Sequence, residues 1–154
     1  IVFSCFIAFL LLFLLFPQKK SFEIDFLDVG QGDGIYLCTG GGTSMFIDGG
    51  STDVKQVGKY RILPFLKAKG VSEISYWFVS HTDTDHVSGL KEVLVSGYRV
   101  EYLVFAKAVE KEAKTKELAE LARSHGTKVF YMQAGDTVRS KRAAMRCLYP
   151  KSCG

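Results

Sequence analysis

The segment SEISYWFVS, residues 72–80, constrains the fold of this chain more than any other. Between Ile74 and Val79 only Ser75 interrupts the apolar residues, so both alternating sets of positions are apolar. Successive side chains of a β-strand point to opposite faces of the sheet, and a strand of this composition is therefore expected to be buried on both faces. Such a strand belongs inside a layered domain.

The residues before this strand predict a meander of three strands. SFEIDFLDV alternates apolar and polar residues, and the glycine-rich turn GQGDG separates it from IYLCT. A second turn, Gly40–Gly42, leads into TSMFID. Tight glycine turns join antiparallel neighbours, so these strands are expected to pair as hairpins.

Strands and helices alternate in the rest of the chain. One helix is expected to have Pro64 in its first turn and to end at Gly70, with Val54–Tyr60 as a looser segment before it. A second helix is expected to begin at Ser88, and a third to cover residues 110–126. Further strands are predicted at EYLVFA, KVFYMQ and RAAMRCLY. A meander followed by alternating strands and helices indicates an α/β layered domain.

The first residues differ in composition from all that follow. Residues 1–16, IVFSCFIAFLLLFLLF, carry no charge and have no polar face. About sixteen residues span roughly 24 Å as a helix, less than the ~30 Å of a hydrocarbon core. We expect residues 1–17 to be the end of a transmembrane helix and residues 18–21 a linker. The alternatives are a secretory signal peptide and a buried helix of a soluble protein.

The charge distribution is uneven but mild. The net charge is +4, and basic residues concentrate after Lys107, including RSKRAAMR at residues 139–146. This pattern is compatible with a polyanionic substrate, and the alternative is an ordinary solvated surface. The four cysteines show no zinc-type spacing.

The loop after the buried strand holds four potential metal ligands in six positions: His81, Asp83, Asp85 and His86. His81 and Asp83 are two apart in extended chain, so their side chains can point the same way. Imidazole and carboxylate groups suit Zn²⁺, Mn²⁺ or iron, and the two aspartates favour Mn²⁺. A metal there would lower the pKa of a bound water toward about 7. The alternative is a helix N-cap turn with incidental histidines.

HTDTDHVSG is similar to the H-x-H-x-D-H motif of the metallo-β-lactamase fold, with Asp83 in place of the second histidine. Together with FLDVGQGDG and FIDGG, it resembles the metallo-β-lactamase-like domain of ComEC-type DNA-uptake proteins from Phe22 to about Tyr149. The resemblance implies the N-terminal part of an αβ/βα four-layer sandwich in residues 22–154, incomplete at its C-terminal end. A membrane segment before the domain also matches that family, whose members are polytopic.

The resemblance implies that the HTDTDH residues hold one or two divalent ions, Mn²⁺ or Zn²⁺. The implied metal ligands are His81, Asp83, Asp85 and His86. Asp85 is the expected catalytic residue, either as a ligand of a second ion or by positioning the attacking water.

Four further positions match motif residues expected to support the ligands or to lie near the substrate: Asp28, Gln31, Asp33 and Asp48. Asp48 would support the ligands from behind. For Asp28 and Asp33 the alternative is turn chemistry, since aspartate beside glycine is common in tight turns. The later histidine His125 is expected to cap a helix.

The resemblance implies a metal-dependent hydrolase domain of a membrane DNA-uptake (competence) protein that cleaves DNA phosphodiesters during internalization for transformation. The expected partners are DNA, the membrane through residues 1–17, and other competence proteins, with the domain on the extracytoplasmic face of the cell membrane. The alternatives are an anchored or secreted hydrolase of esters or other phosphodiesters, and a non-catalytic domain that binds DNA or a partner. Because the family's later ligands are expected beyond Gly154, the chain alone is expected to have little activity.

Overall fold

The computed structural model describes residues 6, 7, 9, 21–140 and 143–149. Its centre is a six-stranded sheet in the order β1-β2-β3-β4-β5-β6. The strands are β1 (Glu23–Phe26), β2 (Gly34–Cys38), β3 (Ser44–Asp48), β4 (Glu73–Val79), β5 (Arg99–Ala106) and β6 (Lys128–Met132), with a separate hairpin of β7 (Thr137–Arg139) and β8 (Ala144–Arg146). The helical segments are the π-helix η1 (Gly58–Ile62), α2 (Leu63–Ala68), α3 (Thr84–Val95), the 3₁₀ helix η2 (Lys107–Val109) and α4 (Ala113–Ser124).

The strand directions confirm the expected meander followed by crossovers. β1, β2 and β3 pair antiparallel, whereas β3 to β6 pair parallel, each connection after β3 passing through a helix. β3 and β4 therefore end at the same edge of the sheet. The turn between β1 and β2 reaches this edge too, because Gly34 pairs with Asp48. The three loops that carry the sequence motifs are in this way brought together.

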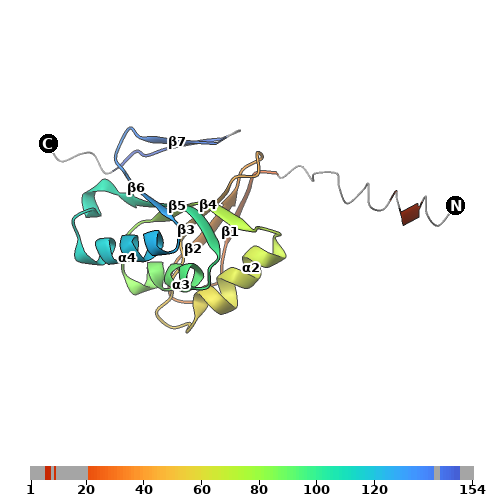
Figure 1. The fold of residues 1–154 in the computed structure, drawn as a ribbon, viewed down its shortest axis with the longest axis horizontal. Coiled ribbons are helices and arrows are strands. Elements are labelled where there is room, and N and C mark those ends of the chain that lie inside the picture. Colours follow the sequence, from red (N-terminus) through yellow and green to blue (C-terminus); the bar gives the residue numbers. More distant parts are fainter. Residues whose placement is uncertain (1–5, 8, 10–20, 141–142, 150–154) are drawn as a thin grey trace.

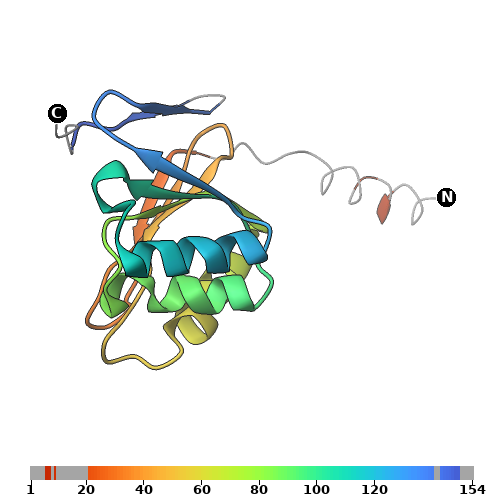
Figure 2. The same cartoon turned by 60° about the vertical axis from the view of Figure 1, so that its left-hand side comes forward.

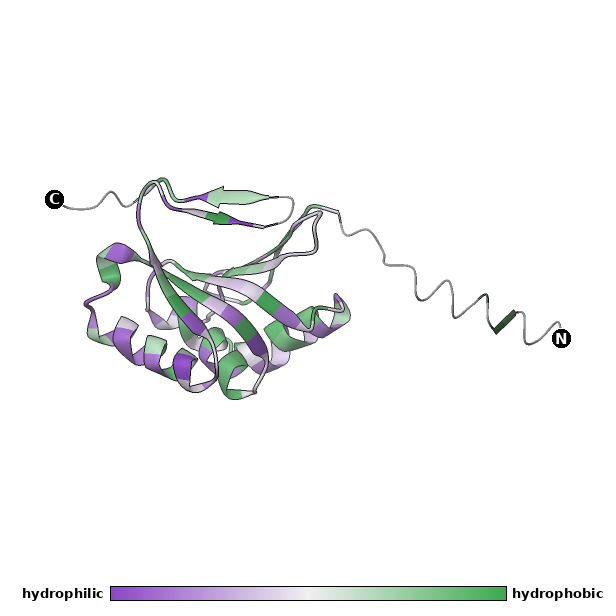
Figure 3. Ribbon diagram, turned by 45° about the horizontal axis from the view of Figure 1, so that its top comes forward, coloured by the Kyte–Doolittle hydropathy of each residue, from purple (hydrophilic) through white to green (hydrophobic). Residues whose placement is uncertain are grey.

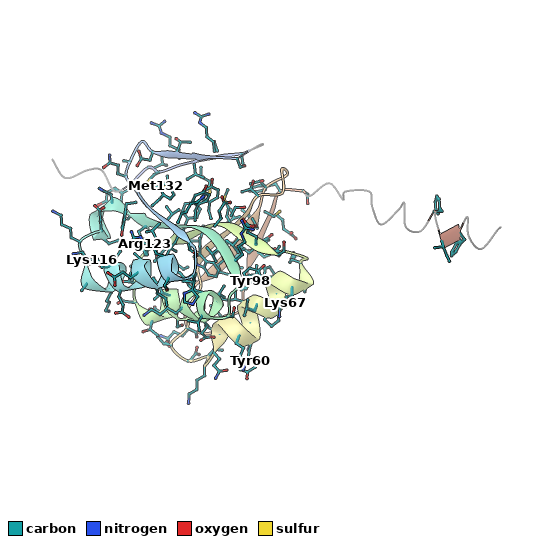
Figure 4. All side chains as sticks on the ribbon, in the orientation of Figure 1. Tyr60, Lys67, Tyr98, Lys116, Arg123 and Met132 are labelled. Atoms are coloured by element: carbon teal, nitrogen blue, oxygen red, sulfur yellow. The ribbon has the colours of Figure 1, made fainter. Side chains whose placement is uncertain are left out.

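Helices α2, α3 and α4 cover one face of the sheet (Figures 1 and 2). The hydrophobic core lies between this helical layer and the sheet. It contains Phe46, Trp77, Leu90, Leu103 and Leu118, each no more than 1% exposed. Trp77 stacks on Phe46 with ring centroids 4.4 Å apart. Full burial of one such side chain stabilises the fold by about 1.5–3 kcal/mol. The outer side of the helical layer is polar, with Lys67, Lys116 and Arg123 exposed (Figure 4).

The other face of the sheet is only partly covered. The hairpin β7–β8 lies over it on the side away from the helices (Figure 3). A cavity of about 450 Å³ separates the hairpin from Tyr76, Tyr102 and Phe130. The prediction that the β4 segment is buried on both faces is therefore correct for its helix-facing residues Trp77 and Val79, while Tyr76 and Phe78 remain partly exposed among the described residues.

Several predicted boundaries were wrong. α3 begins at Thr84 rather than Ser88, because Asp83 is already its N-cap, with φ −76° and ψ 158°. The α4 segment begins at Ala113, since Lys107–Val109 forms the separate 3₁₀ helix η2. The RAAMRCLY strand is confined to Ala144–Arg146, and β7 was not expected at all. Pro64 does lie in the first turn of α2, as predicted.

The N-terminal predictions fall mostly outside the described residues. Within the described part of the chain, no helix is both long and apolar enough to span a bilayer. The transmembrane segment proposed for residues 1–17 and the linker at 18–21 are largely not described, so both stay predictions.

Candidate metal centre

Three loops meet at the edge of the sheet where β3 and β4 end. We call them the signature loop (residues 28–33), the glycine loop (residues 48–53) and the ligand loop (residues 80–86). Backbone hydrogen bonds join them. Asp33 N donates to Asp85 O at 3.2 Å, and Gly50 N donates to Asp33 O at 3.2 Å. The signature loop is therefore held between the other two by its own backbone.

Glycine is required at two of these contacts. A Cβ atom at Gly32 would press on Gly50 O and lie 2.6 Å from Asp85 O. A Cβ atom at Gly50 would press on Thr84 O and lie 2.6 Å from His86 N. Backbone atoms cannot give way as a flexible side chain can, so the glycines of GQGDG and FIDGG allow an approach that any other residue would prevent.

Asp48 lies behind the ligand loop and is 5% exposed. Its carboxylate accepts hydrogen bonds from Ser80 N at 2.8 Å and from Ser80 Oγ at 2.8 Å, and its backbone carbonyl accepts one from Trp77 Nε1 at 2.6 Å. Its φ of 57° is in the left-handed region, where aspartate is better tolerated than most residues. The strained backbone and the buried charge are both stabilised by these donors.

Asp48 also fixes the proton positions of both histidines. An ionised carboxylate only accepts, so His86 Nδ1, 3.0 Å from Asp48 Oδ2, carries the proton. The Ser80 hydroxyl hydrogen is likewise directed to Asp48. Ser80 Oγ then accepts from His81 Nδ1, 3.0 Å away. Both rings consequently have Nε2 free as a lone-pair donor, the arrangement typical of metal-binding histidines.

His81, Asp85 and His86 bring one potential ligand atom each to within 4.8 Å of one another. His86 Nε2 lies 3.4 Å from Asp85 Oδ2, and the two imidazole rings have centroids 3.6 Å apart. His86 is buried, Asp85 half-buried and His81 exposed. Two imidazole nitrogens and one carboxylate oxygen at these distances fit a divalent ion with further positions open to water or substrate.

A second cluster contains Asp33, Asp48 and His86, again with ligand atoms within 4.8 Å. Asp33 Oδ2 is 3.6 Å from His86 Nδ1. This cluster uses the nitrogen that donates its proton to Asp48, so it can bind an ion through His86 only if that hydrogen bond breaks. The first cluster therefore fits a divalent ion better than the second, and Asp33 lies beside it.

Asp83 is in neither cluster. One carboxylate oxygen pairs with Lys114 Nζ of α4 at 2.9 Å, and the other lies 3.9 Å from His81 Nε2. The hydrogen bond and charge of Lys114 hold the pKa of Asp83 below its usual value, and the same contact raises the pKa of Lys114. Of the four expected ligands, the structure brings three together and leaves Asp83 turned toward α4.

Asp28 and Gln31 do not reach either cluster of ligand atoms. Asp28 is 82% exposed, pairs with Arg61 at 3.5 Å and accepts from Gly30 N at 3.3 Å, which is ordinary turn chemistry. Gln31 contributes its backbone instead, since its N–H donates to Asp53 Oδ1 at 2.7 Å. That bond and the Ser51 hydroxyl lower the pKa of Asp53.

Sequence reasoning missed Ser80, Ser88, Asp53 and Lys114. Ser80 connects Asp48 to His81, and Ser88 Oγ accepts from Ser51 N at 3.0 Å. Asp53 ties the glycine loop to the signature loop. Ser80 could have been predicted from the sequence, because it is next to the first motif histidine. Ser88, Asp53 and Lys114 contact distant segments, so no local pattern indicated them.

Two curated proteins resemble this chain. It is 27% identical over 161 residues to ComE operon protein 3 of Bacillus subtilis strain 168, covering 96% of this chain and 21% of that protein. It is 32% identical over 92 residues to Recombination protein 2 of Haemophilus influenzae, covering 58% of this chain and 12% of that protein. The chain thus spans only a small part of either relative. No family model matches it.

Among solved structures, the chain resembles the metallo-β-lactamase fold protein YhfI of Bacillus subtilis, with a TM-score of 0.50 and 15% identity, covering 72% of this chain and 42% of that one. At this identity the likeness shows the fold alone. The predicted α/β fold of metallo-β-lactamase type is confirmed at that level, and so is the resemblance to ComEC-type competence proteins. The complete four-layer arrangement stays a prediction.

We expect Gly50→Ala to abolish metal binding, because its new Cβ would push the ligand loop away from the glycine loop. Overpacking of this kind costs about 1–3 kcal/mol. Gly70→Ala is the control: Gly70 has φ +64° and open space around it, so about 1–2 kcal/mol of backbone strain is expected there without loss of metal affinity. Calorimetric titration with Mn²⁺ or Zn²⁺ and thermal unfolding measure both effects, and equal affinities in the two variants would contradict the assignment.

We expect Asp48→Asn to weaken metal binding by about 10- to 100-fold, the usual effect of losing a hydrogen-bond partner of a ligand histidine. The asparagine amide can donate to His86 Nδ1, which would move the ring proton to Nε2 and block that nitrogen. The control is Asp28→Asn, an exposed carboxylate of the signature loop, which should leave affinity unchanged. An unchanged affinity in Asp48→Asn would show that Asp48 does not support the ligands.

Proposed function

Because the chain is a homologue of competence and recombination proteins, we propose that it is a metal-dependent hydrolase domain of a membrane DNA-uptake protein and cleaves DNA phosphodiesters during internalization for transformation. The observation that carries the proposal is the cluster of His81, Asp85 and His86 in front of the buried Asp48. A structural turn has no need of two histidines with their Nε2 atoms free beside a carboxylate.

A divalent ion in this cluster, Mn²⁺ or Zn²⁺, would supply Lewis acidity and a water of lowered pKa. The chain's own residues do the rest. His81 and His86 offer Nε2, and Asp48 and Ser80 hold both rings in orientation. Asp85, half-buried at the start of α3, would offer one carboxylate oxygen to the ion and would use the other to orient the attacking water and accept its proton.

Basic side chains near the ligand loop would contact an anionic substrate once it displaces their carboxylate partners, because Lys114 pairs with Asp83 and Lys91 lies 3.8 Å from Glu117. Lys91 of α3 and Lys114 of α4 line a cavity of about 230 Å³ together with Thr82 and Thr84 of the motif. Of the basic segment at residues 139–146, Arg146 lines a second cavity, of about 270 Å³, that also contacts Ser80. These positions suit contacts to a phosphodiester backbone.

We extend the proposal to the cellular context. Residues 1–17 would anchor the domain in the cell membrane, with the hydrolase on the extracytoplasmic face, where incoming DNA arrives, and other competence proteins as neighbours. This arrangement rests on the resemblance to the DNA-uptake family and on the apolar composition of residues 1–16.

The test is Mn²⁺-dependent cleavage of labelled single- and double-stranded DNA. The assay uses the full-length protein, because the chain covers only 21% of the length of ComE operon protein 3. Asp85→Asn should lower the cleavage rate by about 10²- to 10⁴-fold, as removal of a general base does. Asp28→Asn is the control. Equal rates for the wild type and Asp85→Asn would overturn the proposed site.

The same assay separates the alternatives. Turnover of simple esters or cyclic phosphodiesters without cleavage of DNA would favour a hydrolase of another substrate class. Metal-dependent DNA binding without any turnover would favour a non-catalytic domain.

A further inference from the structure

Lys114 lies on α4, a helix that carries none of the motif residues, yet it contacts the metal motif. Its Nζ is 2.9 Å from Asp83 Oδ1. The other oxygen of Asp83 is 3.9 Å from His81 Nε2, the nitrogen that faces the proposed ion. The Asp83 carboxylate therefore lies between the Lys114 ammonium and the metal cluster.

We propose that Lys114 is a positioning residue that competes with the metal for Asp83, so that its ion pair sets how many carboxylates the centre offers to an ion. With the pair intact the cluster is His81, Asp85 and His86. With the pair broken, a rotation of the Asp83 side chain adds a second carboxylate beside His81. The inference rests on the proposed metal centre but does not depend on DNA cleavage.

The surroundings of Lys114 allow both states. Its side chain is 68% exposed and Asp83 is 61% exposed, so neither is locked by packing. Glu117 follows Lys114 by three positions on α4, a spacing at which helical side chains meet. Glu117 now interacts weakly with Lys91, at 3.8 Å, across the cavity that Lys114 also lines. A released Lys114 thus has another carboxylate within reach.

The N-cap geometry points the same way. Asp83 is the N-cap of α3, where an aspartate side chain commonly accepts a hydrogen bond from the helix backbone, but its carboxylate makes no such cap bond. The carboxylate is turned to Lys114 instead. The backbone carbonyl of Asp83 accepts from His86 N and Val87 N, but its carboxylate is held by the exposed ion pair with Lys114 and not by the helix. Such a pair is weak enough for a divalent ion to displace.

The test is the Mn²⁺ affinity of the full chain in a double-mutant cycle of Lys114→Met and Asp83→Asn, measured by calorimetry. We expect Lys114→Met to bind Mn²⁺ about two- to fivefold more tightly, the range that corresponds to one exposed ion pair. The gain should disappear in the Asp83→Asn background, because no carboxylate is then released. Lys91→Met removes an equal charge from the same cavity and should leave the affinity within about twofold.

Three results would overturn the inference. An unchanged affinity in Lys114→Met would show that the pair does not compete with the metal. A gain that persists in Asp83→Asn, or appears equally in Lys91→Met, would show a general charge effect. Absence of Mn²⁺ binding in every variant and in the wild type would contradict the proposed metal centre itself, and the inference with it.

Discussion

The backbone contact between Gly32, Gly50 and the start of α3 is the constraint on which the candidate site depends. Three loops that are far apart in the sequence approach so closely that no Cβ atom fits between them. Backbone hydrogen bonds of Asp33 and Gly50 hold this arrangement at 3.2 Å. Because these contacts involve main-chain atoms, they fix the position of the ligand loop at the sheet edge almost independently of the exposed side chains around it.

The buried carboxylate of Asp48 depends on that assembly and in turn orients the ligands. Asp48 ends β3 at the sheet edge, with a left-handed φ of 57°. Trp77 of β4 and Ser80 of the ligand loop donate hydrogen bonds to it. Asp48 thus connects core packing at Trp77, through its backbone carbonyl, to the protons of His81 and His86, through its carboxylate. The left-handed φ and the buried charge therefore occur at the residue that leaves both Nε2 atoms without a proton.

Much of this was predictable from local pattern, and the exceptions have physical causes. Glycine turns predicted the meander, and the alternation of strands and helices predicted an α/β layered domain. The motifs predicted that His81, Asp83, Asp85 and His86 would converge in front of Asp48, and of these only Asp83 turns away, toward Lys114. The start of α3 was misplaced because Ser88 resembles a cap, while Asp83 holds the N-cap position through its backbone conformation alone. Lys114 lies 31 residues from Asp83, so its pairing depends on how α4 packs beside α3, which no local pattern contains.

The central claim is that both histidines bind the ion through Nε2 while Nδ1 keeps its proton. Long-range proton–nitrogen NMR of the imidazole rings tests it most directly, in ¹⁵N-histidine-labelled protein titrated with Zn²⁺. We expect the Nε2 signals of His81 and His86 to shift to metal-bound positions, with protonated Nδ1 in both rings and no change at His125. Zinc bound through Nδ1 of His86, with a proton on Nε2, would contradict the account.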